Sequence, residues 1–206
     1  QKMSLATNLL NVVNDFNRNK KILNEARKNY IINCVTAIEV YLKEAILNYD
    51  FIHAPDNYEA LLKDKISLFD AYKMFNEKQM NVKDVVVSHY SFQNLETIDM
   101  VFSTILGEKY LASLEKHEVD ETKTGSHFFK KKPYTLINNY PKWRSQIGNL
   151  FELRHEVVHQ VDFKHKINYT TIKTSHAVCY AFTIASHFYL QASWNRFFNE
   201  LGKKMG

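Results

Sequence analysis

The sequence predicts an all-α protein: a single helical-bundle domain with a long irregular loop between its middle helices and a late helix that carries the motif. Only 5 glycines and 3 prolines occur in 206 residues, well below the roughly 7% and 5% of average chains, which argues against hairpin-rich folds. With 45% hydrophobic and 24% charged residues, the chain can fill one core and is not disordered. No repeat or compositional shift divides it, so residues 1–206 are expected to form one domain.

Apolar residues spaced three and four apart predict two consecutive amphipathic helices near the start of the chain, over residues 4–28 and 29–49. A Pro-Asp-Asn cluster then breaks the pattern, and its last residue, Asn57, is the expected N-cap of a third helix. This third helix is predicted to run to Lys78.

The middle of the chain contains the one strand candidate, residues 82–90, because three consecutive valines lie at its centre. A helix is then expected to open at residue 91 and to stop at Gly107, where glycine can supply a left-handed cap. A short helix over 108–117 follows. Residues 118–134 are the least regular part of the sequence and are predicted to be the long loop.

Two long helices are predicted to complete the bundle. The first begins near Pro141, which suits a first helical turn, and runs to Gln160; the second runs from Thr170 to Leu201. Residues 174–195 contain no Asp, Glu, Lys or Arg, but their histidine, serine, threonine and amide side chains are too polar for a membrane span. This stretch is therefore predicted to be a buried helix.

Charge and cysteine content restrict the function only loosely. A net charge of +5 is compatible with a polyanionic partner but does not demonstrate one. Cys34 and Cys179 lie in apolar, helix-like stretches without a C-x-x-C pair. They are expected to be buried free thiols in a reducing compartment, the cytoplasm, and they exclude a cysteine-based structural zinc site.

The residues of greatest chemical interest lie in Glu152–Gln160. On a helical wheel an apolar arc faces one side, while Glu152, His155 and His159 fall on the polar side. Arg154 falls within the apolar arc, where arginine is rare unless it is paired or directed into a polar site. A carboxylate such as Glu39 or the phosphate of a ligand is the expected partner. The members of the apolar arc are Leu150, Leu153, Val157, Val158 and Val161.

One interpretation of this segment is zinc hydrolysis. His155 to His159 spell H-E-x-x-H, in which two imidazoles one turn apart bind the metal and Glu156 activates its water. His165 lies where some zinc proteases keep a third histidine. The context disagrees: Asp162 stands where those enzymes place a glycine, and no mixed sheet is predicted before the helix.

The second interpretation is an R-x4-H pair formed by Arg154 and His159. This bare spacing arises by chance more readily than H-E-x-x-H, so the surrounding sequence decides. Residues 153–159, late in an all-helical domain and followed by one more long helix, resemble the signature of the HEPN superfamily of prokaryotic ribonucleases. The similarity extends to Ala37–Leu42 and to the segment from Ser91 to Gly107, and it therefore covers most of the chain.

The resemblance implies a metal-independent endoribonuclease, without cofactor, that acts as a toxin or antiviral effector. It implies that Arg154 and His159 are catalytic with His155 in support, that RNA is the substrate, and that an antitoxin or sensor protein is a further partner. An imidazole can remove the 2′-hydroxyl proton while a guanidinium neutralises the charge on the phosphate. Because Arg154 and His159 lie about 140° apart on an ideal helix, a homodimer that joins two motifs fits this chemistry.

Two alternatives stay open. Some HEPN relatives are non-catalytic RNA- or nucleotide-binding modules. In such a protein Arg154 would be a structural ion-pair partner. Glu39, a candidate supporting residue of the site, would likewise only form a salt bridge. Outside the motif, the run Phe128–Tyr134 interleaves aromatic rings with Lys130, Lys131 and Lys132, a pattern that can hold nucleotides. These lysines and Arg144 are the substrate-binding candidates. The structural alternative is a solvated loop with one end packed on the core.

Overall fold

The computed structural model describes residues 20–48, 60–63, 67, 81–120, 129–160 and 167–205. This part of the chain is all-α, as predicted, and it contains no strand beyond an isolated bridge between Glu118 and Thr135. None of its helices is long and apolar enough to cross a membrane. The helices are α2 (Lys20–Asn48), α5 (Val82–His89), α6 (Leu95–Leu106), α7 (Tyr110–Leu114), α9 (Leu136–Asn139), α10 (Trp143–His159) and α11 (Tyr169–Met205).

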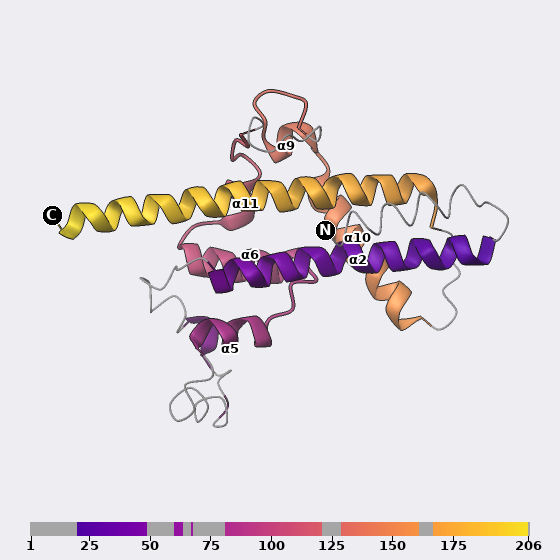
Figure 1. Cartoon of the computed structure of the whole chain (residues 1–206), viewed down its shortest axis with the longest axis horizontal. Helices are drawn as coiled ribbons and strands as arrows, with labels where there is room; N and C mark the ends of the chain where they lie inside the picture. Colours follow the sequence, from indigo (N-terminus) through magenta and orange to yellow (C-terminus); the bar gives the residue numbers. More distant parts are fainter. Residues whose placement is uncertain are drawn as a thin grey trace.

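The longest helices, α2 and α11, lie side by side and run in the same direction (Figure 1). Successive contacts between the two helices involve higher residue numbers on both of them, so the helices are parallel. Near the start of α2, Arg27 Nη1 donates to the Ile167 carbonyl oxygen just before α11 (2.9 Å). Further along, Tyr30 Oη bonds to His176 Nδ1 (2.5 Å). Next, Cys179 Sγ donates to the Cys34 carbonyl oxygen (3.4 Å). Both cysteines are buried free thiols, as predicted.

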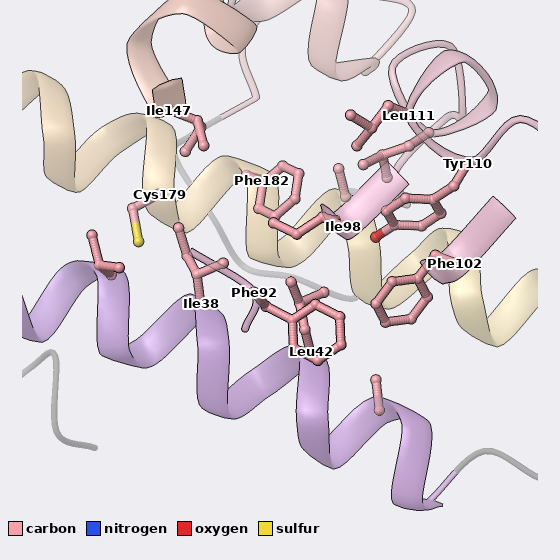
Figure 2. Packing of buried hydrophobic residues seen from close by; sticks show 14 of the residues in the cluster. Ile38, Leu42, Phe92, Ile98, Phe102, Tyr110, Leu111, Ile147, Cys179 and Phe182 are labelled. Carbon is pink, nitrogen blue, oxygen red and sulfur yellow. The ribbon is translucent and has the colours of Figure 1, made fainter. Parts of the chain in front are cut away.

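Helix α10 packs against both α2 and α11 and completes the central layer. Its first residue, Trp143, is fully buried and stacks on Phe182 of α11 with 5.7 Å between the ring centroids. Figure 2 shows how Ile38 and Leu42 of α2 meet Phe182 in the core, with aromatic residues of the α6–α7 region beside them. Burial of these large side chains contributes about 1.5–3 kcal/mol each. The N-terminal part of α10 is therefore anchored in the core.

The first helical stretch differs from the prediction of two helices that meet at residues 28 and 29. Helix α2 continues through this point without a break. Lys28 and Asn29 are compatible with a helix, and Lys28 forms an ion pair with Glu25 one turn earlier (2.9 Å). Residues 4–19, and Asn57 with most of the third predicted helix, lie outside the described residues.

The strand candidate at 82–90 was wrong, because these residues form helix α5. Its start is fixed by a capping box: Asn81 Oδ1 accepts from the Asp84 backbone N–H (3.0 Å), and Asp84 Oδ2 accepts from the Asn81 N–H (2.7 Å). Val85 and Val86 point into the core. Two satisfied backbone donors and two buried valines outweigh the preference of valine for strands.

The other expectations in the middle of the chain agree with the structure in part: the helix expected from residue 91 begins at Leu95, after the N-cap Asn94, and residues 121–128 of the predicted loop lie outside the described residues. Helix α6 ends at Gly107, whose φ of 68° is the predicted left-handed cap. A short helix, α7, follows. Just after the predicted loop lies one element that sequence patterns missed, the single-turn helix α9, which is capped by Thr135. The predicted bounds of the last two helices agree with α10 and α11 to within a few residues.

Candidate active site

The motif occupies the end of α10 that leaves the core. Beyond Phe151 the helix has no fully buried residue, and Figure 1 shows this end projecting past α2. Val158, expected on the apolar arc, is 44% exposed, because it lies at the margin of the arc, while Val157 beside it still packs against the core. Val161 lies outside the described residues. The buried members of α10 are Trp143, Ile147, Leu150 and Phe151, whereas Glu152, His155, Val158 and His159 are exposed.

Arg154 sits at the boundary between core and solvent. The residue is half-buried, and its Nε is shielded from solvent and has no hydrogen-bond partner among the residues that the structure describes. Glu39, the carboxylate expected beside it, is engaged elsewhere: Lys43 contacts Glu39 Oε1 (3.1 Å) and Gln93 donates to Glu39 Oε2 (2.8 Å). Glu39 is therefore not the partner of Arg154. A shielded guanidinium donor without a partner is unfavourable by more than 1–3 kcal/mol.

The two motif histidines lie next to each other on the exposed side of α10. The ring centroids of His155 and His159 are 4.5 Å apart, as one helical turn requires. Both side chains are exposed, whereas Glu156 between them is half-buried. One helix end thus presents a guanidinium at its shielded edge and two imidazoles in solvent. This set can bind an anion and exchange a proton beside it.

The zinc interpretation finds no third ligand within the described ranges. No group of three His, Cys, Asp or Glu side chains there is arranged to hold a metal ion. His165, the expected third histidine, and Asp162 lie outside these ranges.

A polar pair that sequence reasoning missed lies at the same end of the bundle. Tyr30 of α2 is buried and bonds to His176 of α11, which also stacks on Tyr180. Burial lowers the pKa of His176 from its ordinary value, so the neutral imidazole is favoured. The sequence feature that could have indicated this pair is a histidine within a helical stretch that has no charged residues. Together with the bond from Arg27 to Ile167, this pair fixes the segment where α11 begins after the motif.

The lysine candidates lie at the other end of α10, on a loop over residues 129–134 whose two aromatic residues, Phe129 and Tyr134, pack on the core. Phe129 is fully buried and meets the ring of Tyr140 edge-on, while Lys130, Lys131 and Lys132 are exposed. Phe128 lies outside the described residues. Arg144 differs from the lysines: its Nε and Nη2 both donate to Glu115 Oε2 (3.1 and 3.0 Å).

The fold and the motif together define a class of protein. An all-helical domain whose late helix ends in Arg154 and His159, and which is followed by one more long helix, has the architecture expected of an HEPN domain. The comparison with known families agrees, since the RiboL-PSP-HEPN family matches residues 2–186. The chain belongs to this family. No curated protein and no solved structure gave a match.

Proposed function

We propose that this protein is a metal-independent endoribonuclease that cleaves RNA by attack of a 2′-hydroxyl on the adjacent phosphate, in the manner of a toxin or antiviral effector. In this proposal His159 removes the hydroxyl proton and Arg154 neutralises the charge that grows on the phosphate oxygens. His155, one turn before His159, supports it by adding a second imidazole beside the phosphate. Histidine is the side chain that most often carries such a proton transfer.

The observation that carries the proposal is the Nε of Arg154. A half-buried guanidinium with a shielded and unpartnered donor is unfavourable in the isolated fold, and Glu39 does not relieve it. A ligand that supplies the missing acceptor is one way in which such a group is satisfied in a native protein. A phosphate fits because its oxygens match the planar donors of arginine.

The proposal includes a homodimer, because one α10 cannot easily direct both Arg154 and His159 at one phosphate. Large apolar side chains are exposed where α2 and α11 begin and where α10 ends, at the same end of the molecule (Figure 1). A two-fold contact through this end would cover them and bring two motifs together. The exposed residues are Ile22 (57%), Val158 (44%) and Tyr169 (53%).

Cleavage products test the mechanism directly. Attack by the 2′-hydroxyl leaves a 2′,3′-cyclic phosphate and a 5′-hydroxyl, so a 2′-deoxy substitution in the nucleotide 5′ of the cut should abolish cleavage. EDTA should leave the rate unchanged. Mass spectrometry of the products of purified protein and RNA makes the measurement. Cleavage of the deoxy substrate, or loss of activity in chelator, would overturn the mechanism.

A further inference from the structure

The loop of residues 129–134, called the lysine loop here, is held in one conformation by two asparagines. Its backbone is fixed at five points, although its lysine side chains are exposed. Asn139 Oδ1 accepts from the N–H groups of Lys130 (2.7 Å) and Lys131 (2.8 Å), and Asn139 Nδ2 donates to the Lys131 carbonyl (3.0 Å). Asn138 Nδ2 donates to the carbonyls of Lys132 (3.0 Å) and Pro133 (3.1 Å).

The charge on this loop is not neutralised within the described part of the chain. None of Lys130, Lys131 and Lys132 forms an ion pair there; Lys132 Nζ lies 5.8 Å from the ring centroid of Tyr134. Arg144, the nearest arginine along the chain, pairs with Glu115 instead. Three adjacent like charges repel one another. A loop that is fixed while it holds them together is suited to a polyanion with closely spaced charges.

The lysine loop precedes α10 in the chain and the motif lies at the far end of this helix. The loop leads through α9 into the start of α10, and the motif lies at its end. Helix α10 has 17 residues, so its ends are about 25 Å apart at 1.5 Å per residue. At about 3.4 Å per phosphate along a duplex strand, roughly seven nucleotides span that distance, and fewer do so in an extended strand.

We propose that the lysine loop is a second RNA-binding site, remote from the cleavage site, and that the substrate is therefore an RNA long enough to reach both. This inference rests on the proposed function. The loop contributes affinity without taking part in the chemistry, because phosphate contacts position a nucleic acid and carry no base information. A short oligonucleotide occupies only the motif end, whereas a long or folded RNA contacts both.

Binding, rather than cleavage, tests the inference. The triple variant Lys130→Gln, Lys131→Gln, Lys132→Gln is compared with a matched control, Lys63→Gln, Lys109→Gln, Lys203→Gln, which removes the same charge from exposed lysines elsewhere. Both are made in a His159→Ala background so that RNA stays intact. Fluorescence anisotropy is measured against salt with labelled single-stranded RNAs of about four and about thirty nucleotides, lengths below and above the roughly seven-nucleotide span.

The loop variant should bind the long RNA roughly 10- to 100-fold more weakly, and its salt slope should fall by about 2, or 0.7 for each lost phosphate contact. The short RNA and the control variant should be unaffected. Asn139→Ala keeps all three charges but releases the loop, so it should weaken long-RNA binding with an unchanged salt slope.

Three results would overturn the inference: equal binding by the loop and control variants, equal loss for short and long RNA, or displacement of RNA by polyglutamate as effectively as by unlabelled RNA. The last would assign the loop to an acidic protein. If the wild-type protein cleaves no RNA, the proposed function fails. The binding comparison still tests whether the lysine loop binds RNA.

Discussion

At the scale of single residues, Arg154 combines a position that is unfavourable for stability with the catalytic role that we propose for it. It occupies a position on α10 where a leucine would pack against the core without leaving a polar atom unpaired. The shielded Nε therefore makes the folded chain less stable than it could be. Sites of function commonly keep such unfavourable groups. The same guanidinium is a ready partner for an incoming phosphate.

Substitutions in the motif distinguish ribonuclease chemistry from zinc chemistry. Arg154→Ala and His159→Ala should each reduce RNA cleavage by about 10²-fold or more, His155→Ala should reduce it less, and Glu156→Gln should have a mild effect. Arg154→Lys should retain little activity because lysine loses the planar fork. Zinc hydrolysis requires the reverse order, with Glu156→Gln the most damaging.

Single-turnover cleavage rates make this measurement, and thermal melting is its control. Arg154→Ala should melt no lower than the wild type, since it removes an unpaired donor from a shielded position. Normal cleavage by a folded Arg154→Ala protein would show that the pair with His159 is a coincidence of composition.

His176 makes the stability of the fold depend on pH. Burial lowers its pKa in the folded state, so between the folded and the ordinary value the unfolded chain binds more protons. Stability should therefore be full above the ordinary histidine range, near pH 6.5, and should fall as the pH drops through it. His117, whose pKa is also lowered mainly by burial, acts in the same direction.

Urea unfolding between about pH 5 and pH 8 measures this effect. His176→Gln should flatten the pH profile, and His187→Gln, at an exposed histidine of the same helix, serves as the control. An identical pH slope in the wild type and His176→Gln would rule out His176 as the source.

At the scale of elements, two glycines should affect stability in opposite ways, because one ends a helix and the other lies inside one. Gly107 ends α6 with a φ of 68°, whereas Gly148 lies inside α10. An added Cβ would meet no atom within 4 Å at either position. Any change in stability on substitution therefore reflects backbone conformation alone.

Gly107→Ala should destabilise the protein by about 1 kcal/mol, because alanine disfavours the left-handed region. Gly148→Ala should stabilise it by about 0.5–1 kcal/mol, because alanine loses less backbone entropy in a helix. Chemical denaturation of both variants gives the comparison. A destabilising Gly148→Ala would indicate that α10 has a close neighbour at this position in solution, such as a second protomer.

At the scale of the whole molecule, assembly follows from where α10 ends. We expect an isologous dimer that covers the exposed residues around the motif. Val158→Glu should shift the protein to monomer and reduce RNA cleavage strongly, since a carboxylate would be buried at the contact. Met100→Glu changes a residue of similar exposure on α6 (43% against 44%) and should do neither.

Light scattering at micromolar concentration, with and without RNA, checks the assembly state. Dimerisation should not require RNA. A wild-type monomer with full activity would contradict the dimer, and so would equal effects of Val158→Glu and Met100→Glu.

The sequence by itself determined the fold class and the long late helices. Amphipathic periodicity and the scarcity of glycine and proline favour helices through neighbouring residues alone, without any tertiary contact. The sequence also placed Arg154 within the apolar arc of its helix, and it identified Gly107 as a cap. Local patterns failed where a single contact decides between two structures. The valines at 85–87 fit a strand equally well, and only the capping box at Asn81 with burial of Val85 and Val86 selects a helix.

The tertiary structure alone decided which side chains meet. Glu39 pairs with Lys43 and Gln93 rather than with Arg154, Arg144 pairs with Glu115, and Tyr30 finds His176 across two parallel helices. These partners are separated by up to 146 residues in the chain. Periodicity specifies which face of a helix is buried. Which residues of other helices contact that face depends on the direction and crossing angle of the packed helices, and no single segment of the sequence encodes these.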